Sequence, residues 1–374
     1  MKVQIIGNFY NNHSLSIINR ELAIGLKDFC DVQIMPLDSY DSQYKVDKQE
    51  LKIISELQNK YEDPDIEIRH SYPPILRWPA HKKTKVIYIQ HWEYSKVPLE
   101  WQLLWQNFAD FVICSSTWTR DIILNAGMQP SRLIAINPGY DNKIFNTIGR
   151  KTDQDKFTFT YVGCGQYRKG IDILLDAWVS AFAKADNVKL YIKDTPGIYG
   201  ENNILEEILK VQYKTKCGEI VYDDSQLSKE EMADLYKNTD VIVHPYRGEG
   251  FGMHVQEAIA CGAIPLVTQG GSTDDIVQGF GIASHKKIVN LLDPNTFATK
   301  PGDSLTNMGQ HSWMLEPDKT DLVYKMRMLY SFEDTNKIRE EVFNNCSIKT
   351  WEDVIPVYKD ILTLLNEVEV PKRY

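Results

Sequence analysis

The sequence predicts an α/β fold made of two parallel-sheet domains, and two observations lead to that prediction. Short β-branched apolar runs alternate with segments of helical periodicity along the whole chain. The chain also has 374 residues, which is more than one hydrophobic core usually supports. We therefore expect two domains of about 150 to 200 residues each.

The first half of the chain contains five runs typical of buried strands. The first is followed by a polar loop over 8–14 and by a helix around Arg20–Leu22. Ligands of parallel sheets gather at the carboxyl ends of strands, so we expect this loop to face a cleft. The predicted strands are Val3–Gly7, Val32–Met35, Val86–Gln90, Phe111–Ser116 and Leu133–Asn137, with a helix over Trp118–Ala126 between the last two.

A second α/β series follows a linker that we place near 142–155. Its predicted strands are Phe157–Val162, Val188–Ile192, Asp240–Val243 and Ile264–Val267. Near the end, Trp313–Asp318 is expected to open a helix, and Thr350–Glu352 begins a final helix with apolar residues at helical spacing.

Charge and cysteine content exclude several classes of protein. The net charge is −9, and residues 1–150 hold 17 basic and 17 acidic side chains, so the acidic excess lies in the remainder. A nucleic-acid-binding protein would normally present a basic face, and attachment to anionic lipid is weakened but not excluded. The six cysteines are widely spaced, which predicts reduced thiols and a cytoplasmic location. No apolar stretch approaches the about 18 residues that a membrane span requires.

The most informative segment is the glycine-containing turn that follows the run Asp240–His244. Gly250, Phe251 and Gly252 stand where this strand gives way to a helix. A helix N-terminus carries unpaired N–H groups and a partial positive charge, and glycine lets a phosphate approach the backbone. Two carboxylates, Glu249 and Glu257, lie on either side of this turn and are suited to hydrogen bonding with vicinal hydroxyls. We assign Glu257 to a ribose and Glu249 to a sugar.

A second glycine-containing turn, Gly163–Gly170, joins another strand to a helix. It does not fit a dinucleotide-binding fingerprint, because Arg168 stands where the third glycine should be. Its two cations, Arg168 and Lys169, are suited to a diphosphate whose charge increases as a bond to it breaks.

The segment from His244 to Thr268 resembles the Glu-x7-Glu signature of the family 4 retaining glycosyltransferases, which have the GT-B fold of two facing Rossmann-like domains. The resemblance extends over most of the chain and is clearest over 157–177, 235–275 and 313–330. It implies an N-terminal domain over 1–148 on the acceptor side, a donor domain over 149–349, and a last helix, about 350–374, that crosses back to the first domain.

The resemblance also implies roles for individual residues. Lys169 stands where the family has a lysine that holds the donor pyrophosphate, whereas Cys164 replaces the usual arginine, so Arg168 or Arg247 is expected to supply that charge. His91 is expected near the reacting sugar, with Ser14, Trp92 and Glu93 on the acceptor side. The predicted catalytic residues are thus Glu249, His91 and Lys169. The predicted donor site consists of Arg168, Lys169, Arg247, Gly250, Phe251, Gly252 and Glu257.

The resulting functional hypothesis is a metal-independent, retaining hexosyltransferase. It moves a hexose from a GDP- or UDP-sugar to a hydroxyl of a glycan or glycoconjugate, with no metal site and no cofactor besides the donor. Its partners are then the donor and the acceptor, without nucleic acid, and peripheral membrane contact is left open. Two alternatives also stay open: a non-catalytic nucleotide-sugar-binding or scaffold protein of the same fold, and a nucleotide-sugar epimerase.

Overall fold

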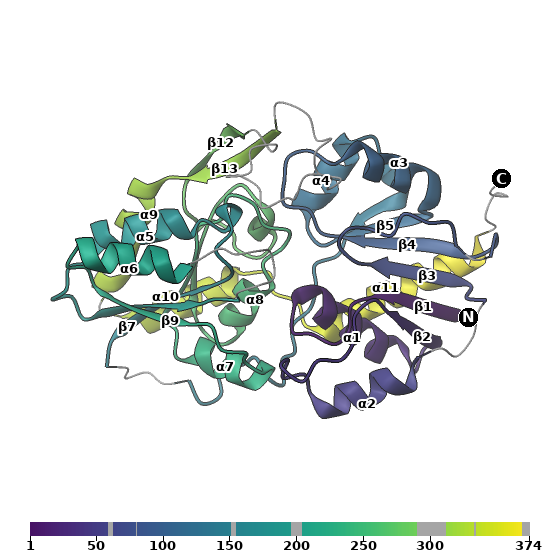
Figure 1. Cartoon of the computed structure of the whole chain (residues 1–374), viewed down its shortest axis with the longest axis horizontal. Helices are drawn as coiled ribbons and strands as arrows, with labels where there is room; N and C mark the ends of the chain where they lie inside the picture. The colour runs from purple at the N-terminus through teal and green to yellow at the C-terminus, as the bar shows by residue number, and fades with distance from the viewer. Residues whose placement is uncertain are drawn as a thin grey trace.

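The protein consists of two lobes, each built on a parallel β-sheet, that lie side by side (Figure 1). The computed structural model describes residues 1–58, 63–79, 81–150, 155–195, 204–289, 312–332 and 334–368. The two sheets draw their strands from separate halves of the chain. The second sheet has a core within its own lobe, whereas a core of the first lobe continues across to second-lobe residues such as Phe251, Val255 and Ile276. The domain boundary predicted at 148/149 falls between the last strand of the first sheet and the first strand of the second, and it stays a prediction.

The first lobe contains a six-stranded sheet in the order β2-β1-β3-β4-β5-β6. Its strands are β1 (Lys2–Gly7), β2 (Asp31–Pro36), β3 (Ile66–His70), β4 (Lys85–Gln90), β5 (Phe111–Cys114) and β6 (Leu133–Ala135). The five strands predicted from apolar runs are present, but β3 was missed because charged residues interrupt its pattern. The structure buries two of them as an ion pair, in which Arg69 Nε donates to Glu67 Oε2 over 2.8 Å.

Alternating side chains of this sheet divide between two layers of helices. Ile87 and Ile89 of β4 pack in one core with α1 (Ser14–Leu26), α2 (Lys48–Glu56) and α11 (Trp351–Glu367). Val86 and Tyr88 face the other side, where the core includes α3 (Leu99–Phe108) and α4 (Thr117–Asn125). Both faces are therefore covered, as expected of a parallel sheet.

The second lobe contains a five-stranded sheet in the order β11-β10-β7-β8-β9. Its strands are β7 (Phe157–Val162), β8 (Val188–Lys193), β9 (Glu219–Asp223), β10 (Val241–His244) and β11 (Ile264–Val267). Its helices are α5 (Ile171–Ala181), α6 (Ile204–Lys214), α7 (Lys229–Lys237), α8 (Met253–Ala260), α9 (Lys319–Ser331) and α10 (Thr335–Asn345). The edge strand β9 was not predicted, since it holds only five residues and begins and ends with a carboxylate.

The segment predicted to open a helix near the C-terminus is instead a strand. β13 (Ser312–Pro317) pairs antiparallel with β12 (Ser284–Val289), and the helix α9 starts only after Asp318, whose carboxylate accepts from the amides of Thr320 and Asp321. The helical prediction was wrong over 313–317 because a partner strand determines the conformation of this short apolar run. Trp313 of β13 also meets Trp118 of α4 at 5.4 Å between ring centroids, so the hairpin touches the first lobe.

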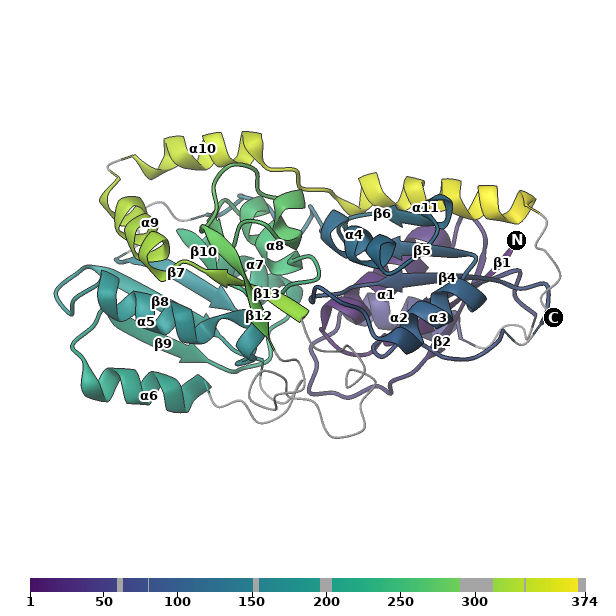
Figure 2. The ribbon, with the colours of Figure 1, turned by 90° about the horizontal axis from the view of Figure 1, so that it is seen from above.

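The final helix lies on the first lobe. α11 packs against α1, and Lys85 of β4 donates to the carbonyl oxygen of Leu365. Figure 2 shows α10 beside the second lobe and α11 beside the first, with a single connection between them. The chain therefore crosses between the lobes a second time before it ends.

Candidate functional site

A cleft of about 290 Å³ lies between the lobes and is lined by residues of both. The first lobe contributes the loop before α1 and the end of β4, and the second lobe contributes the two glycine-containing turns. The lining includes the predicted site residues Ser14, His91, Glu93, Arg168, Lys169, Glu249, Gly250, Phe251, Gly252 and Glu257. Residues predicted from segments far apart in the sequence thus share one cavity, although their roles stay predictions.

The N-terminus of α8 points its free amides at this cleft. Gly252 takes a left-handed conformation with φ of 99° before the first helical residue, Met253. Within the described ranges, the amides of Phe251, Gly252 and Met253 have no protein acceptor, whereas the amide of Gly250 donates to Glu249 Oε1 over 3.0 Å. Unpaired amides at a helix start form a binding site for an anion such as phosphate.

Lys169 reaches the same point from the turn after β7. It ends the short helix Tyr167–Lys169, and its ammonium group contacts Glu249 Oε2. Arg168 lies beside it, with its guanidinium 3.4 Å from Glu93 and 3.9 Å from Glu249. Two cations therefore flank the turn that offers the free amides.

Glu249 is held as a carboxylate by these neighbours. Burial alone would raise its pKa, but Lys169, the imidazole of His244 and Arg168 together hold the pKa well below its usual range. His244 Nε2 lies 3.1 Å from Glu249 Oε2. Burial lowers the pKa of His244 to about 4, so this histidine is neutral near pH 7 and donates Nε2–H to the carboxylate.

Glu257 lies one helical turn inside α8 and behaves differently. Burial raises its pKa to about 8, because the nearby Lys229 and the Tyr236 hydroxyl only partly offset the cost of burying the charge. The Tyr236 hydroxyl lies 3.4 Å from Glu257 Oε2. The two carboxylates of the motif therefore differ in protonation state near neutral pH.

A chain of hydrogen bonds fixes the tautomer of His91. The Asn19 amide nitrogen donates to two backbone carbonyls, so its oxygen must accept from His70 Nδ1 at 2.7 Å. His70 Nε2 lies 2.8 Å from His91 Nε2, and burial lowers the pKa of both rings, that of His91 to about 4. With both rings neutral, His91 donates Nε2–H to His70 and keeps an unprotonated Nδ1. His91 can thus accept a hydrogen bond from a hydroxyl.

Hydrogen bonds between the lobes hold the motif in place. Ser115 and Ser116, at the end of β5, donate their hydroxyls to the carbonyl oxygen of Gly250 at 3.0 and 2.8 Å. On the other side of the cleft, Lys229 of α7 contacts Glu21 of α1 at 2.8 Å. Sequence reasoning missed these residues. The serines carried a weak signal, since they stand at the carboxyl end of a predicted strand, whereas nothing in the sequence marks Lys229 and Glu21 as partners.

The structure places two predicted site residues away from the cleft. The Arg247 guanidinium binds Asp172 at 2.7 Å and Glu316 at 2.9 Å, so its charge is already compensated by carboxylates outside the lining. Trp92 is fully buried in the core beneath α3, and its indole N–H donates to the carbonyl oxygen of Lys96. The cleft lining therefore gives no support to the donor role predicted for Arg247 or to the acceptor role predicted for Trp92. Of the two candidates for the charge missing at Cys164, only Arg168 lines the cleft.

Three side chains behind the turn have the composition of a metal site. Ligand atoms of His244, Glu249 and His254 lie within 4.8 Å of one another. However, both oxygens of Glu249 already accept from protein donors, and the Lys169 ammonium group lies against one of them. A cation placed there would be repelled by Lys169.

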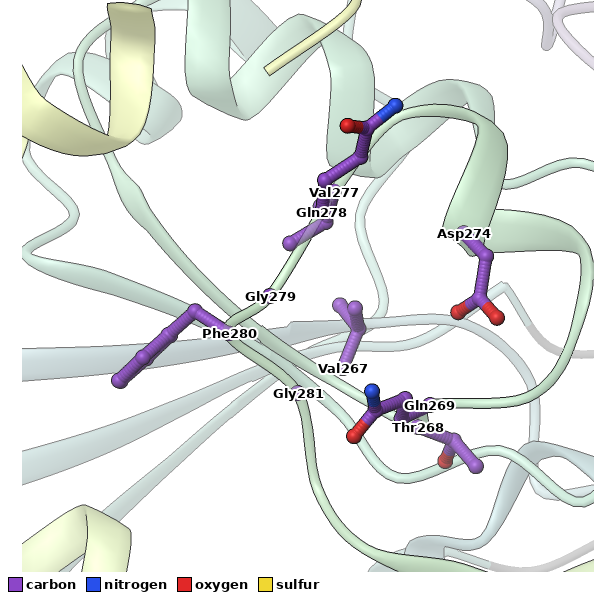
Figure 3. A pocket seen from close by; sticks show the side chains of 9 residues that line it. All are labelled: Val267, Thr268, Gln269, Asp274, Val277, Gln278, Gly279, Phe280 and Gly281. Carbon is purple, nitrogen blue, oxygen red and sulfur yellow. The ribbon is translucent and has the colours of Figure 1, made fainter. Parts of the chain in front are cut away.

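A second hollow lies elsewhere in the second lobe, between the end of β11 and the segment over 277–281 (Figure 3). It has a volume of about 210 Å³ and shares no lining residue with the cleft. Asp274 is its one titratable lining residue, and the Asp274 carboxylate accepts from the Gly270 amide. The interlobe cleft is therefore the better candidate for chemistry.

Gly170, which follows Lys169, stands where the backbone leaves no room for a side chain. Its φ is 71°, and a Cβ atom would lie 1.9 Å from the backbone carbonyl oxygen of Pro245. We expect Gly170→Ala to lower the free energy of unfolding by about 1 to 3 kcal/mol, because neither backbone can move away freely. Chemical denaturation measures this loss. Gly149 has a similar φ, but a Cβ atom there would meet open space. A larger loss of unfolding free energy in Gly149→Ala than in Gly170→Ala would contradict the steric argument.

Comparisons with known proteins agree with this architecture. Residues 144–287 match the family model described as "Glycosyl transferases group 1". Among solved structures, sucrose-phosphate synthase from Thermosynechococcus elongatus aligns over 98% of this chain and 99% of its own, with a TM-score of 0.65 and 13% identity. Anabaena Alr3699/HepE in complex with UDP and glucose aligns over 97% and 99%, with a TM-score of 0.60 and 13% identity.

The chain has the GT-B fold. The predicted fold class is thereby confirmed. These similarities do not test the assignment to family 4, which stays a prediction.

Curated relatives are similar over shorter spans. D-inositol 3-phosphate glycosyltransferase 1 of Catenulispora acidiphila is 25% identical over 240 residues, which are 58% of this GT-B chain and 57% of the relative. Mannosylfructose-phosphate synthase of Agrobacterium fabrum is 25% identical over 188 residues, or 46% and 40% of the two chains. The chain thus spans about half of the length of these relatives. Among the described helices, none qualifies as a candidate bilayer-spanning segment.

Proposed function

We propose that this protein transfers a hexose from a nucleotide diphosphate-sugar, GDP- or UDP-linked, to a hydroxyl of a glycan or glycoconjugate. Transfer retains the anomeric configuration and needs no metal ion, as the resemblance to family 4 implies. The observation that carries this proposal is the meeting of Lys169, Arg168 and the free amides of the α8 N-terminus with the carboxylate of Glu249 in one interlobe cleft.

In the proposed complex the donor contacts both glycine-containing turns. The diphosphate docks on the amides of Phe251, Gly252 and Met253, with Lys169 and Arg168 beside it. As the glycosidic bond breaks, negative charge grows on the leaving diphosphate, so these fixed donors stabilise the transition state more than the ground state. Glu257 faces the ribose, and the hexose lies toward Glu249 and His91.

The acceptor approaches from the first lobe, on the side of Ser14, His91 and Glu93. The unprotonated Nδ1 of His91 accepts a hydrogen bond from a hydroxyl of the donor sugar or of the acceptor. Attack on the same face from which the diphosphate leaves, with the leaving phosphate accepting the proton, accounts for retention. No covalent nucleophile is assigned.

The cations present in the cleft support the proposal that transfer needs no metal ion. Lys169 and Arg168 supply the positive charge that a divalent ion supplies in other phosphate-transfer sites. We therefore expect donor turnover to survive treatment with EDTA, with no gain from added Mg²⁺, Mn²⁺ or Zn²⁺. A loss on chelation that Zn²⁺ restores would instead assign a metal to His244, Glu249 and His254.

Thermal-shift measurements test the donor site and rank the bases. Binding raises the melting temperature through a term RT ln(1 + [L]/Kd), so UDP, GDP and their sugars can be compared directly. We expect either the UDP or the GDP series to raise the melting temperature. An unchanged melting temperature with every nucleotide would contradict the proposal. Slow release of free sugar from the bound donor would separate an enzyme from a non-catalytic binder, and an epimerised sugar without acceptor would indicate an epimerase.

The pKa of Glu257 predicts a pH-dependent affinity. A carboxylate accepts from both ribose hydroxyls, and burial raises the pKa of this group to about 8. We expect the Kd for the preferred nucleotide to fall as the pH rises from about 6 to about 8, up to tenfold per unit, and Glu257→Gln to remove this slope. Calorimetric titration checks both, and an unchanged slope in the variant would place the titrating group elsewhere.

The raised pKa of Glu257 also makes the stability of the folded protein depend on pH. The folded pKa of Glu257 lies above its ordinary value of 4.5, so the protonated carboxyl favours the folded protein at low pH. This contribution is complete below about pH 4.5 and is lost as the pH rises through about 8. Bound nucleotide is expected to offset the loss.

For cellular location we propose the cytoplasm, since all six cysteines are free thiols.

A further inference from the structure

The outer surface of the first lobe presents a group of apolar side chains around α3. Five large apolar residues on α3 and on the loop between β3 and β4 are each 50% to 56% exposed. They are Tyr72, Leu76, Trp78, Leu99 and Leu103, which we call the α3 patch. Single exposed apolar residues are ordinary, but a contiguous group of them marks an interaction surface.

Ring and helix geometry show that the α3 patch is contiguous. Tyr72 meets Trp101 near the start of α3 at 5.8 Å between ring centroids, and Trp78 meets Phe108 at its end at 4.1 Å. The loop therefore runs along the helix. Leu99 and Leu103 are one turn apart on α3, whereas Trp101 and Trp105 face the core. Figure 2 shows that α3 lies on the opposite side of the lobe from α11.

Basic side chains flank the α3 patch at both ends. Arg77, Lys82, Lys83 and Lys96 are exposed, and within 71–79 and 81–108 the one exposed carboxylate is that of Glu100. Lys82 and Lys83 lie three and two residues before β4, at whose start the Val86 amide donates to Asp110, two residues beyond Phe108. These two lysines thus lie at the Trp78 end, and Lys96 lies at the other end, just before α3.

We propose that the α3 patch binds the surface of an anionic phospholipid bilayer. Tryptophan and tyrosine combine an apolar body with a polar tip and favour the boundary between headgroups and acyl chains, where leucine can insert. Lysine and arginine beside them attract anionic headgroups. The net charge of −9 weakens this contact only at long range, because the acidic excess lies outside residues 1–150 and charges are screened over about 8 Å at physiological salt.

The position of the α3 patch relates it to the cleft. Tyr72 lies two residues after His70, whose ring contacts His91 of the cleft lining. A bilayer bound to the α3 patch would therefore lie close to the first-lobe side of the cleft. Exposed apolar and basic side chains would bind a bilayer whether or not the cleft carries out the proposed transfer.

Vesicle co-sedimentation tests the proposal. Full-length protein is mixed with vesicles of phosphatidylcholine alone or of phosphatidylcholine with phosphatidylglycerol. We expect it to sediment with the second kind and to stay mostly soluble with the first. Lys82→Glu with Lys83→Glu is expected to weaken binding at least about tenfold, since each basic residue near the surface contributes about 1 kcal/mol. Trp78→Ser with Leu103→Ser is expected to weaken it comparably through lost insertion.

The second lobe supplies a matched control. Leu209 and Tyr213 of α6 are also exposed, at 56% and 91%, but Glu206 and Glu207 accompany them on that helix. Leu209→Ser with Tyr213→Ser should therefore leave vesicle binding unchanged. All variants should melt within a few degrees of the parent, which shows that they fold. Failure of the parent protein to bind phosphatidylglycerol vesicles, or equal losses in the α6 variant, would overturn the proposal.

Discussion

Lys169→Ala is expected to lower kcat/KM for donor turnover by about 100- to 1000-fold. The Lys169 ammonium group lies at the N-terminal turn of α8, where the leaving diphosphate gains charge. Removal of one fixed donor from such a site costs about 2.7 to 4 kcal/mol of transition-state stabilisation. Release of nucleoside diphosphate from the donor that gives the largest thermal shift measures the loss.

Two comparisons make this result specific. Lys287→Ala removes a lysine that pairs with Glu316 outside the cleft lining, so its turnover should match that of the parent. Lys169→Ala also deprives Glu249 of a partner, and turnover must therefore be expressed per folded molecule at a temperature below the transition. Turnover within a few-fold of the parent would remove Lys169 from the donor site.

Glu249→Gln is expected to reduce both stability and turnover. The side chains of Lys169 and Glu249 are only 12% and 11% exposed, and the substitution leaves the lysine without its charged partner. Loss of one member of a buried ion pair typically costs about 3 to 5 kcal/mol. The glutamine keeps the size of the side chain, so the loss reports charge rather than packing. Equilibrium unfolding in denaturant measures it.

A double-mutant cycle isolates the pair. Glu249→Gln combined with Lys169→Met removes both charges, and the double variant should be more stable than the sum of the two single losses predicts. Simple additivity would show that Lys169 and Glu249 act independently. Bound nucleotide should restore part of the stability of Glu249→Gln, because the diphosphate supplies negative charge to Lys169.

Some of the site could be predicted because its signal is local. The strand before Gly250, the glycine at the start of α8 and the two glutamates all lie within a short stretch of sequence, so backbone periodicity and residue type define an anion-binding helix start. The turn that carries Arg168 and Lys169 is local in the same way. Both turns were therefore recognised, and the structure brings them to one cleft.

Other features depend on residues far apart in the sequence. Arg247 was a candidate for the charge that is missing at Cys164. Its guanidinium instead pairs with Asp172 and Glu316, outside the cleft lining. The strand β13 was expected as the start of a helix, because nothing local indicates its partner β12. The His70–His91 contact and the serine bonds to Gly250 likewise join segments 21 to 135 residues apart.

The sequence by itself determined the alternation of strands and helices, the two glycine-containing turns and the residue types that suit a diphosphate and a sugar. These follow from backbone periodicity, glycine conformation and side-chain chemistry, which act over a few neighbouring residues. Only the tertiary structure decided which charges are compensated, which histidine nitrogen is free and which carboxylate is protonated. Those properties depend on burial and on partners from distant segments, and the strength of an electrostatic interaction is set by both.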